Sequence, residues 1–151
     1  MAESARSLQL ALPTAMDVAR GVNRLLLAEG LSPIQEFALP NNRRLDVAAL
    51  GFDGTIIGVE IKVSVADLRA DEKWPEYLSF CDLFYFAVPP EFPQHLLPAT
   101  TGLMVADRFG GAILRESPRK ALHAARRRAL ILRFGMIAAE RLTRELDPNC
   151  A

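Results

Sequence analysis

The sequence predicts a single α/β domain in which helices flank a central mixed β-sheet. Its 151 residues suit one domain with one hydrophobic core. Half of the residues are hydrophobic and 24% are charged, a composition typical of soluble globular proteins. Stretches with helical periodicity and stretches with strand character follow one another in the order helix, three strands, helix, strand, two strands and helix. That order predicts one mixed sheet with helices packed on it.

The predicted domain spans residues 14–146, between an N-terminal arm (residues 1–13) and a C-terminal tail (residues 147–151). The arm lacks the apolar segment of a secretory signal, and no apolar run approaches the roughly 18 residues that a membrane helix needs. Cys81 and Cys150 lie far apart, which favours unpaired thiols in a reducing compartment. We therefore expect a cytoplasmic protein, associated with the nucleoid, and no membrane partner.

The first helix and the first strand precede a polar break. Thr14 and Asp17 form a capping-box pattern that begins the helix, and Gly30 ends it. Ile34–Leu39 then has the character of a strand, which Pro40-Asn41-Asn42 ends.

Two further strands, Leu45–Leu50 and Thr55–Val63, form a hairpin around the turn Phe52-Asp53-Gly54. A three-residue loop places Asp46 directly opposite Glu60. A two-residue loop would instead put Asp46 on the apolar face of the neighbouring strand, because a slip by one residue reverses every side chain. We therefore expect the three-residue loop, with its glycine in the left-handed conformation.

The elements after the hairpin follow from caps, prolines and apolar runs. Ser64-x-x-Asp67 predicts a second helix start, and Pro75 is expected to interrupt this helix and to begin a short one that runs to about Phe80. The continuous apolar run Leu83–Val88 (LFYFAV) is typical of a strand buried on both faces. Two short strands are expected at Gly102–Ala106 and Ala112–Leu114.

A long helix is expected from Pro118 onward, with an apolar stripe on one side. The stripe consists of Leu122, Leu130, Phe134, Ile137 and Leu142. The net charge is zero, but residues 29–82 carry ten acidic and five basic side chains, whereas residues 115–144 carry nine basic and two acidic ones. A metal site beside a groove for a polyanion would show this distribution, and so would a solvated terminal helix.

Asp46 and Glu60 are the pair that indicates chemistry. Directly opposed residues on paired strands have Cβ atoms about 4.5–5.5 Å apart. Two carboxylates that close repel each other unless a proton or a cation lies between them, and a hard divalent cation prefers oxygen ligands. The alternative is an exposed strand face balanced by Lys62 and Arg44. The strand IIGVEIKV is otherwise almost entirely apolar, so we favour half of a metal site.

The spacing of Asp46, Glu60 and Lys62 gives the pattern D-x(n)-E-x-K on the second and third strands. This pattern resembles the PD-(D/E)XK nuclease superfamily, which implies a restriction-endonuclease-like three-layer fold. Longer stretches look like the MmcB-type DNA repair proteins of bacteria, over roughly residues 16–142: GVNRLL from Gly21, RRLDVAALGFDGTIIGVEIK from Arg43 and GLMVADRFGGAIL from Gly102. The resemblance implies a nuclease-type site and a role in DNA repair.

The resemblance also implies roles for individual residues. Asp46 and Glu60 would hold Mg²⁺ or Mn²⁺, with the carbonyl group of Ile61 as a backbone ligand. Lys62 would position or deprotonate the water that hydrolyses the phosphodiester bond, and would stabilise the phosphate.

One departure from the superfamily concerns a further acidic ligand. Several of these nucleases contribute an acid from the first helix, where this chain has Ala19 and Arg20, with Asp17 about a turn earlier. Glu36 on the first strand is the candidate replacement, and an exposed strand residue fits Glu36 equally well. The choice between one metal ion and two therefore stays open.

Basic and aromatic residues near the pattern are candidate DNA contacts. Arg43 and Arg44 precede Asp46 and would grip phosphate, and Lys73 and Tyr77 would line the substrate groove. The side chains of Arg126-Arg127-Arg128 point to more than one side of a helix, so we take Arg126 and Arg127 as the candidates there. For each of these residues a solvated or structural role is the alternative.

The sequence therefore favours a Mg²⁺- or Mn²⁺-dependent DNA endonuclease that acts in repair on damaged, single-stranded or branched DNA. The alternative is a DNA-binding or adaptor module of the same fold, with weak or no nuclease activity, recruited by a repair-protein partner. A homodimer stays open, because a small nuclease often needs a second subunit to cut both strands. The chain has no Gly-rich phosphate loop, no G-x-S-x-G motif and no Cys/His cluster, which argues against a metabolic α/β enzyme.

Overall fold

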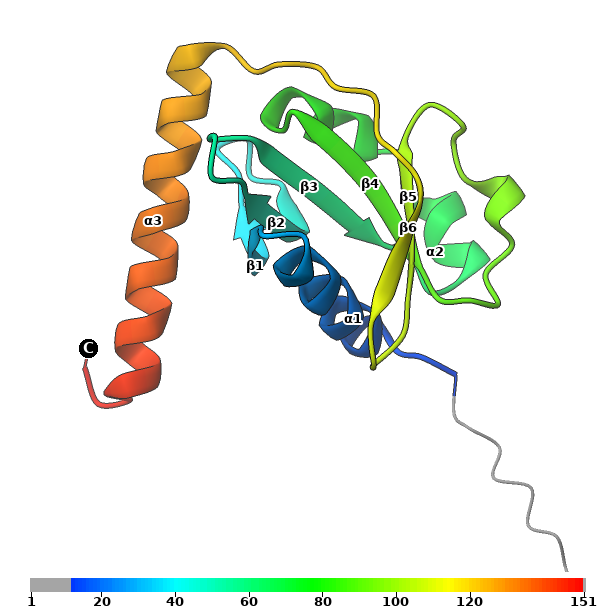
Figure 1. Cartoon of the computed structure of the whole chain (residues 1–151), viewed down its shortest axis with the longest axis horizontal. Helices are drawn as coiled ribbons and strands as arrows, with labels where there is room; N and C mark the ends of the chain where they lie inside the picture. Colours follow the sequence, from blue (N-terminus) through cyan, green and yellow to red (C-terminus); the bar gives the residue numbers. More distant parts are fainter. Residues whose placement is uncertain (1–11, 151) are drawn as a thin grey trace, which may run out of the picture.

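The computed structural model describes residues 12–150 and contains a six-stranded sheet with helices on both faces (Figure 1). Its helices are α1 (Ala15–Ala28), α2 (Val65–Ala70) and α3 (Ala124–Leu146), with the 3₁₀ helices η1 (Trp74–Phe80) and η2 (Gln94–Leu96). Its strands are β1 (Ser32–Ala38), β2 (Arg44–Leu50), β3 (Ile56–Ile61), β4 (Leu83–Val88), β5 (Gly102–Ala106) and β6 (Gly111–Arg115). Residues 1–11 of the predicted arm and Ala151 of the predicted tail lie outside the described residues.

The sheet is mixed, as predicted, and its strands lie in the order of the chain, from β1 to β6. The pairs β1–β2, β2–β3 and β5–β6 are antiparallel, whereas β3–β4 and β4–β5 are parallel. The crossover from β3 to β4 contains α2 and η1, so this connection brings two short helices to the end of β3.

The β2–β3 hairpin has the predicted register. Val47 pairs with Val59, and the N–H of Gly51 donates to the carbonyl oxygen of Thr55 at 2.8 Å. Gly54 has a φ of 87°, the left-handed conformation that a three-residue loop requires.

Two apolar layers cover the sheet. On one face α1 packs Val18, Val22 and Leu26 against residues of β2, β3 and β4. Its N-terminus has the predicted capping box, in which the Thr14 side chain and the Asp17 side chain each accept a backbone N–H. Close packing requires Gly21, where an added Cβ would clash with the β5–β6 turn. Because the capping box is local, it was enough to predict where α1 begins.

The other face is covered by η1 and α3. Trp74 stacks on Phe84 with 6.0 Å between ring centroids, and Phe134 of α3 lies 5.7 Å from Phe37 of β1. In Figure 1, α3 stands beside the β1–β2 end of the sheet. Side chains along α3 contact this end of the sheet. Near the start of the helix, Arg127 donates to the carbonyl oxygen of Gly54. Near its end, Arg141 donates to the carbonyl oxygens of Gln35 and Glu36.

The long C-terminal helix begins at Ala124, so the prediction of a start at Pro118 was wrong. Asp82 explains the difference, because its carbonyl oxygen accepts the N–H of Lys120 and its carboxylate accepts the N–H of Leu122, both at 2.9 Å. These bonds hold the preceding segment in an extended form. The predicted apolar stripe is also shorter than expected: Leu130 is buried, but Leu142 is 60% exposed.

The same Asp82 anchors α3 through Arg127, with two nitrogen–oxygen distances of 2.6 Å. Burial alone would raise the pKa of Asp82, but hydrogen bonds from Arg127 and from the backbone of Ile56 and Leu122 lower this pKa to about 2. Removing one partner of a buried pair typically costs about 3–5 kcal/mol of unfolding free energy. Arg127 therefore has a structural task.

The predicted interruption at Pro75 comes earlier in the structure. Helix α2 ends at Ala70, and the Asp71 side chain accepts the N–H groups of Lys73 at 2.9 Å and Trp74 at 3.1 Å. These side-chain bonds make a turn before the proline is reached. Among residues 12–150, no helix has the length and apolar character needed to cross a membrane.

Candidate active site

The β2–β3 ladder ends where the two opposed acids stand. Beyond the pair Val47–Val59, the N–H of Asp46 donates to Glu60 Oε1 at 3.3 Å. The N–H of Ile61 donates to Asp46 Oδ2 at 2.8 Å. Carboxylate oxygens thus replace backbone carbonyl oxygens as acceptors, and the register predicted from the loop places the two acids side by side.

Both carboxylates are more basic than usual. Glu60 is only 5% exposed, and burial together with the charge of Asp46 raises the pKa of Glu60 to about 8. Burial also raises the pKa of Asp46, and the charge of Glu36 adds to that effect, although the N–H of Ile61 opposes it. The charge of Lys62 lowers both pKa values but does not offset the burial, and a bound divalent cation would add the missing positive charge.

Lys62 lies beside Glu60, as predicted, but its shortest charge contact is with Asp71, which is not among the predicted site residues. Lys62 Nζ is 2.7 Å from Asp71 Oδ2 and 3.8 Å from Glu60 Oε2. The backbone N–H of Lys62 donates to the carbonyl oxygen of Ala87, which continues the β3–β4 pairing past the end of β3. No sequence pattern marks Asp71, because it lies in a segment that we predicted to be helical.

The donor set fits a hard divalent cation in part. Asp46 and Glu60 each use one oxygen for a backbone N–H and leave the other without a hydrogen bond from the described residues. Mg²⁺ is commonly held by one or two carboxylates, with water and substrate phosphate as its other ligands. Within residues 12–150, no group of three or more His, Cys, Asp or Glu side chains is arranged to hold a metal ion. Asp46 and Glu60 are therefore the two side-chain ligands that the hairpin brings together.

Glu36 lies on β1 at the position opposite Asp46, but it already forms an ion pair with Arg44. The β1–β2 register, with Gln35 opposite Val47, places Glu36 across from Asp46. Glu36 has a φ of 53°, uncommon for a residue other than glycine, and its Oε2 is 2.5 Å from Arg44 Nε. Its role as a metal ligand stays a prediction.

Two open cavities meet at the acid pair, and Asp46 and Glu60 line both. The larger, of about 660 Å³, has a basic and aromatic wall that includes Arg43, Arg44, Lys73, Tyr77 and Arg133. The smaller, of about 320 Å³, contains Glu36, Lys62 and Asp67 together with the first turn of α1. The carboxylates can therefore be reached from both faces of the sheet.

The larger cavity contains four of the six predicted DNA contacts. Arg43 is paired with Glu76 at 2.5 Å, and Arg44 is paired with Glu36 as above, so part of their charge is already balanced. Lys73 and Tyr77 also line the cavity, and Lys73 forms no ion pair with another of residues 12–150. Arg133 of α3 lines the cavity as well, and it too forms no ion pair among the described residues. No sequence pattern marks Arg133, because only tertiary packing brings α3 to this cavity.

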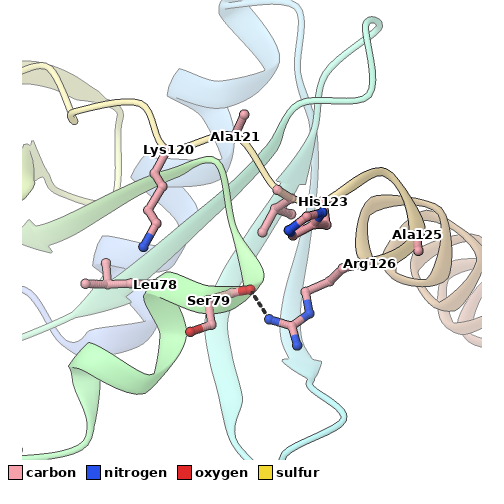
Figure 2. Close-up of a pocket in the computed structure, with 8 residues that line it drawn as sticks. Leu78, Ser79, Lys120, Ala121, His123, Ala125 and Arg126 are labelled. Carbon is pink, nitrogen blue, oxygen red and sulfur yellow. Dashed lines mark hydrogen bonds between the residues drawn. The ribbon is translucent and has the colours of Figure 1, made fainter.

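The other two predicted contacts lie elsewhere. Figure 2 shows Arg126 in a separate cavity of about 590 Å³ at the start of α3, where its guanidinium donates to the carbonyl oxygen of Ser79 at 3.0 Å. The same guanidinium lies 4.8 Å from the centre of the Phe80 ring. Arg127 is bound to Asp82. Neither arginine lines the cavities that contain Asp46 and Glu60.

Comparison with known proteins gives a family and a related structure. A family model described as "DNA repair protein MmcB-like" matches residues 4–149. The solved structure of a protein of unknown function from Silicibacter pomeroyi is 43% identical in sequence, with a TM-score of 0.89. The match covers 94% of this chain and 97% of that chain. No curated protein matches.

The metal-free protein is expected to lose stability as the pH rises from about 4.5 to about 8. Below this range Glu60 is protonated in both the folded and the unfolded chain; within it, the unfolded chain releases a proton that the folded chain keeps. Glu60→Gln removes this titration. The variant should therefore show a shallower pH dependence and exceed the wild type in stability at about pH 8. Chemical denaturation of EDTA-treated protein across this pH range measures the slope of stability against pH and the stability at about pH 8.

Glu140→Gln is the matched control, because Glu140 forms an exposed pair within α3 with Arg144. This control should keep the wild-type slope of stability against pH. Identical slopes for the wild type and Glu60→Gln would show that Glu60 titrates normally and would contradict the account of the acid pair.

Proposed function

The chain belongs to the MmcB-like DNA repair protein family, and we propose that it serves repair as a Mg²⁺- or Mn²⁺-dependent DNA endonuclease. One observation carries the proposal: Asp46, Glu60 and Lys62 come together at the end of a hairpin ladder, beside a cavity with a basic wall. Buried acids with raised pKa values in a cavity are a common property of catalytic sites.

Phosphodiester hydrolysis would need a bound metal ion and a cationic side chain, and different residues would supply the two. Mg²⁺ or Mn²⁺, held by Asp46 and Glu60 with the Ile61 carbonyl group, would polarise the phosphodiester and lower the pKa of a water molecule. Lys62 places a further positive charge 3.8 Å from Glu60 Oε2, where it can hold a phosphate oxygen or the attacking water by a charge-assisted hydrogen bond. Removing such a donor typically lowers the rate on the order of 10²-fold.

The larger cavity supplies contacts for the DNA backbone. Arg43 and Arg44 are partly balanced by Glu76 and Glu36, whereas Lys73 and Arg133 have no ion-pair partner among residues 12–150. Basic side chains without an acidic partner gain most from a phosphate. We expect Lys73 and Arg133 to make the main phosphate contacts near the acid pair.

A DNA-binding or adaptor module is the second candidate function. Two observations favour it: Glu36 is occupied by Arg44, and within residues 12–150 the acids make no three-ligand group. Such a module would bind DNA in a salt-sensitive manner, would keep this binding in Asp46→Asn, and would form no product.

The nuclease proposal predicts metal-dependent cleavage of at least one DNA structure. Single-stranded, nicked, branched and damaged DNA should each be incubated with Mg²⁺, Mn²⁺ or EDTA. Cleavage should occur with the metals, disappear with EDTA and fall on the order of 10²-fold or more in Lys62→Ala, because the phosphate loses a cationic donor. Lys120→Ala, an exposed lysine that lines neither cavity of the acid pair, is the control. Equal cleavage by the wild type and Lys62→Ala, or no cleavage of any substrate, would sink the nuclease proposal.

DNA binding should depend on Arg133 more than on a comparable arginine of the same helix. Arg133→Ala is expected to weaken binding and to reduce the slope of log affinity against log salt concentration by about one, because one phosphate contact is lost. Arg144→Ala is the matched control, since Arg144 is exposed and paired with Glu140. Fluorescence anisotropy in EDTA at several salt concentrations measures both slopes. Equal effects of the two substitutions would argue against the larger cavity as the DNA-binding surface.

A further inference from the structure

We propose that Asp71 is a positioning residue that fixes the ammonium group of Lys62 beside the acid pair. The kinetic part of this inference rests on the proposed nuclease function; the contact itself does not. Asp71 lies just after α2, at the start of the segment that leads into η1, and it was absent from the predicted site.

Both oxygens of Asp71 are used. Oδ2 is 2.7 Å from Lys62 Nζ, and Oδ1 accepts the N–H groups of Lys73 at 2.9 Å and Trp74 at 3.1 Å. Burial alone would raise the pKa of Asp71, but these bonds together lower it. The carboxylate is therefore held by the backbone and presents its second oxygen to the lysine.

The support of Asp71 is itself rigid. Trp74, whose N–H binds Asp71, packs against Phe84 and Phe86 of β4 with centroid distances of 6.0 and 5.5 Å. The side chains of Lys62 and Asp71 are only 10% and 12% exposed. A buried ion pair on an anchored segment keeps one geometry, whereas a lysine in water samples many.

A lysine at this place needs such a partner. Its four-carbon stem is flexible, and Glu60 Oε2, at 3.8 Å, is too far for a hydrogen bond. Without Asp71, the flexible stem would let the ammonium group leave its place beside the acid pair and sample the open cavity. Asp71 thus keeps Lys62 near the acids.

Asp71→Asn is the informative variant, because an asparagine oxygen can still accept the N–H groups of Lys73 and Trp74. The turn after α2 is retained and only the charge facing Lys62 is lost. Glu72→Gln makes the same chemical change one residue away, at an exposed side chain, and serves as the control.

The kinetic test uses the full chain with Mn²⁺ and the DNA that the wild type cleaves best. Asp71→Asn should lower kcat on the order of ten- to hundred-fold, with little change in KM, and Asp71→Glu should restore part of the loss. In the Lys62→Ala background, Asp71→Asn should cause no further loss, because its effect passes through the lysine. The same loss in both backgrounds, or no loss in the wild-type background, would overturn the proposal.

A second readout needs no activity. Labelling of lysines with an amine-reactive reagent, followed by mass spectrometry, should show Lys62 reacting several-fold faster in Asp71→Asn than in the wild type or Glu72→Gln. Unchanged labelling of Lys62 would overturn the proposal even if the protein is a nuclease. Faster labelling in a protein without cleavage would support the Asp71–Lys62 contact while the nuclease function fails.

Discussion

The carboxylates of the partly buried Asp46 and the buried Glu60 lie side by side where β2 and β3 stop pairing. The rest of the site is arranged around this pair. Burial of acids costs free energy unless hydrogen bonds or positive charge offset it. Here the offset is incomplete: one backbone N–H serves each carboxylate, and Lys62 is shared with Asp71. The raised pKa values of Asp46 and Glu60 express the remaining deficit of positive charge. A fold that keeps such a deficit in a cavity is suited to bind a cation.

The arginines of α3 have two different roles: one is held in an ion pair that stabilises the fold, and another is free to contact a ligand. Arg127 forms an ion pair with Asp82, and this contact fixes the start of α3. Six residues further on, Arg133 lines the cavity with the acid pair and has no ion-pair partner among residues 12–150. Because α3 lies along the β1–β2 end of the sheet, its first part is a structural anchor and its middle is a wall of the site. The family's role in DNA repair suits a basic wall of this kind.

Residue type and spacing in the sequence were enough to predict the features that depend on neighbouring residues in the chain. The capping box at Thr14, the strand Leu83–Val88 and the hairpin register follow from spacing and residue type, and the register is what places Asp46 opposite Glu60. The start of α3, by contrast, depends on Asp82, which lies 40 residues before Leu122. Asp71 and Arg133 reach the site only through tertiary packing, which no periodicity in one chain reveals.

The central claim is that Asp46 and Glu60 together hold a divalent cation, and calorimetric titration of the EDTA-treated, dialysed protein with Mn²⁺ tests it most directly. We expect a binding isotherm for the wild type, its loss in Glu60→Gln and in Asp46→Asn, and its retention in the surface control Glu140→Gln. The same Mn²⁺ affinity in Glu60→Gln as in the wild type would contradict the account.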